Sequence, residues 1–150
     1  MRAFGPHIVP SPEQVVRRAL LLASVGTNDL ICVAGPDGLD AMVSLCRAGF
    51  ERVECARQAT CAGADEACQL LLIVGRTDAQ ALSDTVARTA RLLADGGLLI
   101  AQLSRLADEA GVRHTLRALG FEAPSSVFDR SATPLVLLTV RRAAALRKAG

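Results

Sequence analysis

The residues that most often carry out catalysis are few in this chain and widely spaced. Nucleophilic hydrolases place a serine or cysteine on a sharp elbow beside a base, typically in Gly-x-Ser-x-Gly, and that segment does not occur. A phosphate-binding loop needs Gly-Lys-Ser/Thr after a strand, which is also missing. His114 lies in a helical pattern with Arg113 and Arg117, where a surface histidine is the ordinary interpretation. We therefore name no catalytic residue.

Cysteine is the other residue type that could supply chemistry here. The sequence has five: Cys32, Cys46, Cys55, Cys61 and Cys68. They form no Cys-x-x-Cys pair, whereas structural zinc usually needs four ligands at tighter spacing. We therefore expect no metal, and buried thiols that behave as small hydrophobic side chains. The odd count and the lack of a secretory signal favour reduced thiols in the cytoplasm.

One segment has the pattern of a cofactor-binding turn. Residues 29–38 are a short apolar run that ends in a turn with two glycines, and a helical pattern follows over 39–48. A mononucleotide-binding unit begins with this order of elements: a strand, then a tight turn, then the start of a helix. Gly35 and Gly38 suit the turn, and Asp37 either contacts a cofactor or caps the helix.

Apolar spacing predicts the elements around this turn. Helices are expected at 13–23, after the Ser11-Pro12-Glu13 start, and at 39–48, 78–94 and 106–119. Asp95-Gly96-Gly97 would stop the third helix. Buried runs predict strands at 30–34, 51–56, 68–74, 98–103, 122–128 and 135–140.

The order of these elements predicts an α/β fold. Because the strands are continuous apolar runs that alternate with helices, we expect a Rossmann-like, mostly parallel sheet with helices on both faces. The last two strands, joined by a short loop, should form an antiparallel hairpin. We expect one domain over 13–142, an extended arm over 1–12 and a basic tail over 143–150.

Composition excludes several classes of protein. Hydrophobic residues make up 51% of the 150 residues, which argues against disorder. The net charge is +2 and the four aromatic residues are all Phe, so neither charge nor base stacking favours a nucleic-acid partner. No apolar run approaches the ~18 residues of a membrane span.

Three segments resemble the class I S-adenosylmethionine-dependent methyltransferases. Residues 7–31, from His-Ile-Val-Pro-Ser-Pro to Asp-Leu-Ile, are similar to the lead-in of bacterial enzymes related to protein-lysine methyltransferases. Residues 89–100, Thr-Ala-Arg-Leu-Leu-Ala-Asp-Gly-Gly-Leu-Leu-Ile, resemble the family's "ARLLKPGGRLV" segment, and 116–121 resemble its last helix end. The resemblance covers roughly residues 6–142 and implies S-adenosylmethionine as the cofactor.

The resemblance also implies which residues would touch that cofactor. Gly35, Asp37 and Gly38 match the turn after the first strand, and Glu54 is the candidate acid for the ribose hydroxyls. Glu54 stands about two residues early, because the family's position falls near Ala56. An exposed strand residue is the alternative interpretation of Glu54.

Several family features are altered in this chain. The acid that ends the first strand is replaced by Cys32 or Val33, and Pro36 removes one backbone donor from the turn. Only the short segment 57–66 stands where the family has a helix and a third strand, and no Asn-Pro-Pro or Asp-Pro follows 68–74.

Three hypotheses for function follow. The first is a methyltransferase-fold protein with a degenerate cofactor site that acts as a non-catalytic binding or regulatory module. The second is an active small methyltransferase acting on protein or a small molecule. The third is a different small α/β protein, such as a nucleotide-linked regulator. A protein partner or a second copy could pair with the sheet edge left by the lost strand.

Overall fold

The computed structural model describes residues 10–56, 67–129 and 135–143. Its strands are β1 (Ile31–Ala34), β2 (Val53–Cys55), β3 (Cys68–Ile73), β4 (Leu93–Leu103), β5 (Ser125–Asp129) and β6 (Leu135–Arg141). Its α-helices are α1 (Pro12–Leu22), α2 (Gly38–Arg47), α3 (Ala79–Thr89) and α4 (Glu109–Ala118). Most of the expected arm, the segment 57–66 and most of the basic tail lie outside the described residues.

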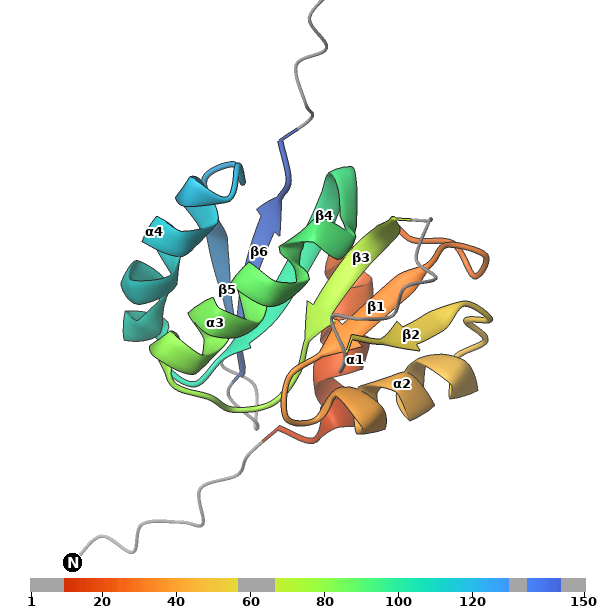
Figure 1. Ribbon diagram of the computed structural model, residues 1–150. Coiled ribbons are helices and arrows are strands. Elements are labelled where there is room, and N and C mark those ends of the chain that lie inside the picture. Colours follow the sequence, from red (N-terminus) through yellow and green to blue (C-terminus); the bar gives the residue numbers. More distant parts are fainter. Residues whose placement is uncertain (1–9, 57–66, 130–134, 144–150) are drawn as a thin grey trace, which may run out of the picture.

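The strands form one six-stranded sheet in the order β2-β1-β3-β4-β6-β5 (Figure 1). β1 pairs in parallel with β2 and β3, and β3 pairs in parallel with β4. β6 is antiparallel to both β4 and β5. The predicted mostly parallel sheet with a C-terminal antiparallel hairpin is therefore confirmed.

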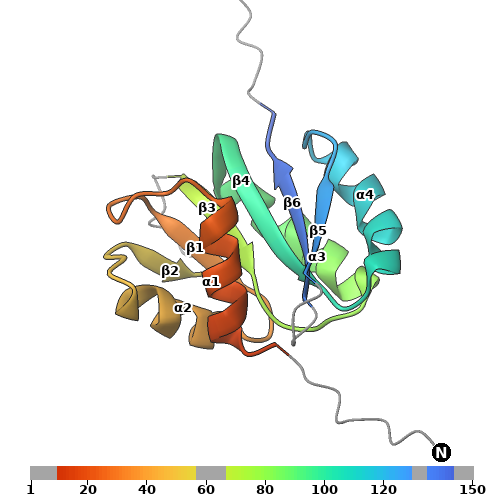
Figure 2. The same ribbon diagram turned by 180° about the vertical axis from the view of Figure 1, so that it is seen from behind.

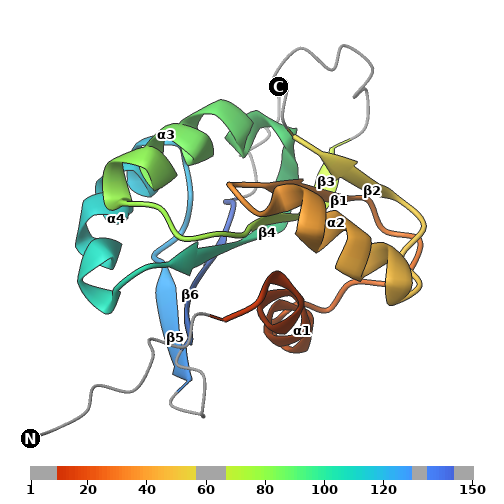
Figure 3. The same cartoon turned by 90° about the horizontal axis from the view of Figure 1, so that it is seen from below.

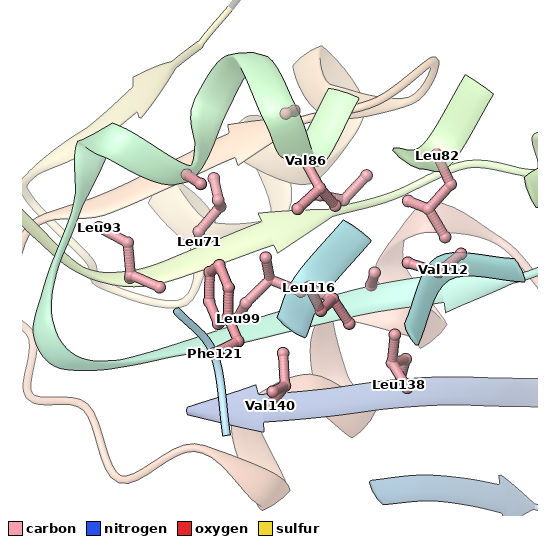
Figure 4. Packing of buried hydrophobic residues seen from close by; sticks show 14 of the residues in the cluster. Leu71, Leu82, Val86, Leu93, Leu99, Val112, Leu116, Phe121, Leu138 and Val140 are labelled. Atoms are coloured by element: carbon pink, nitrogen blue, oxygen red, sulfur yellow. The ribbon is translucent and has the colours of Figure 1, made fainter. Parts of the chain in front are cut away.

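Helices cover both faces of the sheet, as Figures 2 and 3 show for α1 on one side and α3 and α4 on the other. The core under α1 and α2 includes the fully buried Val15, Ala41 and Leu45. The core under α3 and α4 is built on buried aliphatic residues of both helices and of β3, β4 and β6 (Figure 4). Leu, Val, Ile and Ala make up most of both cores, and Phe121 joins the core under α3 and α4.

The predicted start of α1 is confirmed in atomic detail. Ser11 is the N-cap: its Oγ accepts from the Gln14 N–H at 3.2 Å, and its own N–H donates to Gln14 Oε1 at 2.8 Å. This reciprocal pair is a capping box, and Pro12 occupies the first turn, where its missing N–H costs nothing.

The prediction of one helix over 78–94 is wrong at its C-terminal end. α3 stops at Thr89, a 3-10 turn runs over Ala90–Leu92, and Leu93 already belongs to β4. The guanidinium of Arg142 donates to the carbonyls of Ala90, in the 3-10 turn, and Leu93, at the start of β4, so it holds the chain where it leaves α3 and enters β4. The segment 95–97 consequently lies within β4 and does not stop a helix.

The other boundaries differ by a few residues. The helix predicted over 106–119 begins as a 3-10 turn at Leu106–Asp108, and α4 proper ends before Gly120, whose φ of +86° suits the expected stop. β2 is shorter than predicted, and β5 begins at Ser125 after the isolated bridge between Phe121 and Arg142.

Candidate functional site

The carboxyl ends of β1, β2 and β3 meet at one edge of the sheet. After β1 the chain forms β2 on one side and β3 on the other, which makes the space between β1 and β3 a topological switch point. Ligands of open α/β sheets bind at such points. A cavity of about 340 Å³ opens here, lined by Ala34, Gly35, Pro36, Cys55, Ala56, Thr77, Thr85, Arg88, Thr89 and Leu92.

The turn after β1 packs directly on the turn after β3. Gly35 has φ of +93°, and a Cβ on it would stand 2.4 Å from the carbonyl oxygen of Val74. Gly75 has φ of +118°, and its Cβ would stand 2.8 Å from Cδ of Pro36. The Asp37 N–H also donates to the Val74 carbonyl at 3.0 Å. Both glycines are therefore required for contact between two parts of the backbone.

The turn after β3 is also fixed from β4. Gln102 is buried, and its Oε1 accepts from the Gly75 N–H at 2.8 Å. The hydroxyl of Ser104 donates to the Thr77 carbonyl at 2.7 Å. Since these bonds join residues 27 positions apart, the position of the turn depends on the tertiary fold.

The four residues predicted to contact a cofactor occupy different places. Gly35 lines the cavity. Gly38 is buried at the start of α2, and Asp37 is its half-buried N-cap residue without a side-chain capping bond. Glu54 is exposed on β2 and does not line the cavity, whereas Ala56, two residues on, does. The structure thus brings Gly35 to the cavity and leaves the carboxylates of Asp37 and Glu54 outside its lining.

Cys32 and Val33 are the two positions at which the resemblance implies an acid on the first strand, and both side chains are buried, that of Cys32 in the core beneath α3 and α4 and that of Val33 in the core beneath α1 and α2. A hydrogen bond from Cys68 on the neighbouring strand lowers the pKa of the Cys32 thiol. The same hydrogen bond, together with burial, raises the pKa of Cys68. The two thiols therefore form a buried pair in the sheet, set apart from the cavity lining.

Four cavity residues from the α3 side were not among the predicted site residues. Thr85 and Thr89 donate their hydroxyls to the carbonyls four residues earlier, at 3.0 and 2.7 Å. Thr77 Oγ1 is buried and has no hydrogen-bond partner among the described residues. Arg88 is exposed beside them and forms no ion pair with the part of the chain that the structure describes. The available sequence signal was that Thr85 and Thr89 interrupt an otherwise apolar helix face.

Two arginines near the C-terminal end of the described chain make internal contacts. Arg141 Nη1 donates to the Gly96 carbonyl at 2.9 Å, and Arg142 binds carbonyls at the junction of α3 and β4. Among the described residues, no group of three His, Cys, Asp or Glu side chains is arranged to hold a metal ion. No described helix has both the length and the hydropathy for crossing a bilayer.

Comparison with known proteins defines the class of fold. No protein-family model matches the chain, and no curated protein sequence does. Solved structures do match: a ribosomal protein L11 methylase from Lactobacillus delbrueckii subsp. bulgaricus aligns with a TM-score of 0.63 at 13% identity, covering 92% of this chain and 83% of that one. The chain has the Rossmann-like fold of class I S-adenosylmethionine-dependent methyltransferases.

Two further structures share this fold. A precorrin-6y C5,15-methyltransferase from Geobacter metallireducens GS-15 aligns with a TM-score of 0.57 at 13% identity, covering 93% of this chain and 94% of that one. A magnesium protoporphyrin IX methyltransferase from Synechocystis PCC 6803, with bound S-adenosylmethionine, aligns with a TM-score of 0.58 at 13% identity, covering 87% and 79%.

The described part of the cavity lining can be compared with the cofactor site that the resemblance implies. That site needs a carboxylate for the ribose hydroxyls and open backbone beside the glycine turn. No carboxylate is among the described residues that line this cavity, and the backbone at Gly35 lies against Val74.

Proposed function

We propose that this protein is a methyltransferase-fold module with a degenerate cofactor site, which binds a ligand or partner and does not transfer methyl groups. The observation that carries the proposal is the contact between the two turns. Pro36 and Asp37 lie against Val74 and Gly75 at the switch point, where a cofactor's methionine part would need open backbone.

Two further features support this proposal. The acid expected on the first strand is replaced by Cys32 or Val33, and both side chains lie in the core. The acid expected on the second strand has its candidate in Glu54, which is exposed and outside the cavity lining. Since no carboxylate is among the described lining residues, these residues would not give the ribose hydroxyls the charge-assisted hydrogen bonds that the resemblance implies.

The test is isothermal titration with S-adenosylmethionine and, separately, with S-adenosylhomocysteine. We expect no binding of either at millimolar ligand, with circular dichroism confirming that the protein is folded. The same titration is repeated with Asp37→Ala and Glu54→Gln. Micromolar binding that is lost in either variant would overturn the proposal and favour the alternative, an active small methyltransferase.

The alternative has one observation in its favour. A cavity does open at the carboxyl ends of β1, β2 and β3, which is where open α/β sheets bind their ligands. Methyl transfer depends mainly on alignment of a nucleophile with the methyl group, so a missing catalytic base does not exclude it. The titration separates the two functions because only the enzyme requires cofactor affinity.

The partner of such a module stays a prediction. In the described part of the chain β2 pairs only with β1, so its other edge carries unpaired backbone groups. The predicted homodimer would use this edge. Light scattering at high protein concentration checks it, and a monomeric mass would contradict it.

A further inference from the structure

We propose that the cavity at the ends of β1, β2 and β3 binds a small organic monocarboxylate with an apolar body. The inference rests on the proposed function, because an S-adenosylmethionine site would occupy the same edge of the sheet. A volume of about 340 Å³ is at the lower end of the range for small-molecule sites.

The charge of the ligand follows from Arg88 and from the lack of acids. Arg88 is the ionised side chain among the described lining residues, and it forms no ion pair with them. An anion in the cavity would be attracted by the guanidinium, whereas a cation would be repelled, with no carboxylate among the described lining residues to compensate. The lining therefore selects against cationic ligands.

The position of the ligand's acceptor follows from Thr77. Its hydroxyl is buried without a hydrogen-bond partner, although a buried donor normally has one. Thr85 and Thr89 differ, because their hydroxyls already donate to helix carbonyls. Thr77 is therefore the residue among the described lining whose hydroxyl retains a free proton, and because Oγ1 is covered in this structure, the Thr77 side chain rotates to present it to a carboxylate oxygen.

The remainder of the lining accommodates hydrocarbon. Ala34, Pro36, Ala56 and Leu92 contribute apolar side chains opposite the polar group. Burial of an apolar body against them supplies the non-directional part of the binding free energy, and the few polar groups fix orientation. Cys55 also lines the cavity, so the rate at which its thiol is alkylated can report whether a ligand occupies the cavity.

The experiment compares three probes that share one body and differ in charge: 4-phenylbutyrate, 4-phenylbutan-1-ol and 4-phenylbutylamine. The folded protein is treated with iodoacetamide in the presence of each, and peptide mass spectrometry gives the alkylation rate of Cys55. The exposed Cys46 on α2 serves as the internal control. We expect the carboxylate to protect Cys55 best and the amine least, with Cys46 unaffected.

Single substitutions at Arg88 and Thr77 test which residues bind phenylbutyrate. Arg88→Gln should weaken phenylbutyrate binding roughly two- to fivefold, the range of an exposed ion pair. Thr77→Val should weaken it about tenfold, because it removes a hydrogen bond to a charged group. Arg47→Gln, which removes an exposed arginine from α2, is the matched control and should leave binding unchanged.

Thermal melts of the free variants complete the design. Thr77→Val should melt at or above the temperature of the unsubstituted protein, because it removes a buried hydroxyl without a partner. The proposal is wrong if the amine protects Cys55 as well as the carboxylate, if none of the three probes protects it, or if Arg47→Gln and Arg88→Gln act alike. Cofactor binding in the titration described above would instead overturn the proposed function.

Discussion

The ring of Pro36 lies against the backbone of Gly75, so close that a Cβ added to Gly75 would stand 2.8 Å from the proline Cδ. This contact joins the turn that follows β1 to the turn that follows β3. Both turns lie at the switch point of the sheet, and Gly35 and Pro36 also line the cavity that opens there. Four predictions concern the contacts that hold this arrangement and the rest of the fold.

Gly75→Ala should destabilise the protein by roughly 2–4 kcal/mol, since it adds steric overlap with Pro36 to the strain of a positive φ. Gly49→Ala separates the two effects, because Gly49 also has a positive φ of +100° but open space around its Cβ. We expect the control to cost about 1–2 kcal/mol. Urea unfolding measures both variants, and equal losses would contradict the proposed contact.

Gln102→Leu should remove the acceptor of the Gly75 N–H and leave that buried donor without a partner. The expected loss is about 1–3 kcal/mol in the free energy of unfolding. Gln69→Leu is the comparison, because Gln69 is exposed on β3. If chemical denaturation gave both variants the same midpoint, the Gln102 bond would have no role in stability.

Arg142→Met should destabilise the end of α3. The substitution removes the guanidinium from the carbonyls of Ala90 and Leu93 and from Asp95, charged contacts across the junction of α3 and β4 that we expect to contribute about 1–2 kcal/mol. Arg141→Met should cost less, because Arg141 reaches the Gly96 carbonyl from an exposed position. Thermal melts of the two variants give the comparison, and a larger loss for Arg141 would be inconsistent with this role of Arg142.

Stability should fall in acid through Glu109. The hydroxyl of Ser126 donates to Glu109 Oε2 at 2.6 Å and Arg113 binds Oε1 at 2.8 Å, and these bonds lower the pKa of Glu109. A lowered pKa in the folded state gives stability that is present above the unfolded value, about 4.3, and is lost as the pH falls through the folded value.

Urea unfolding between about pH 3 and pH 6 tests this dependence around the ordinary pKa of Glu. Ser126→Ala should reduce the acid-dependent loss of stability, since it removes the hydrogen bond that lowers the pKa of Glu109 the most. Ser125→Ala, at the exposed neighbouring position, should not. An unchanged pH dependence in Ser126→Ala would show that the bond does not set the pKa.

Local sequence signals predicted the fold well where the determinants are local. Ser11 and Gln14 are three residues apart, so the start of α1 could be predicted from the residues alone. The end of α3 could not, because Leu92 and Leu93 continue the apolar pattern of a helix. The group that binds the carbonyls of the turn after α3 belongs to Arg142, about fifty residues further along the chain.

The candidate site was less predictable, because its residues are brought together by contacts between distant parts of the chain. Gly35 was placed in a tight turn from its sequence, and its positive φ agrees. The reason for a glycine there, the carbonyl of Val74, is visible only once β3 lies beside β1. Thr77 and Arg88 reach the cavity because α3 packs over the sheet. The spacing of residues in the sequence does not predict how that helix packs.

The position of β6 sets an order of assembly. β6 follows β5 in the chain, yet it lies between β4 and β5 in the sheet. During synthesis on the ribosome, β4 and β5 therefore emerge with no strand to join them, and β4 keeps an open edge until residues 135–141 appear. A nascent chain paused before that point presents this edge to chaperones and to other nascent chains.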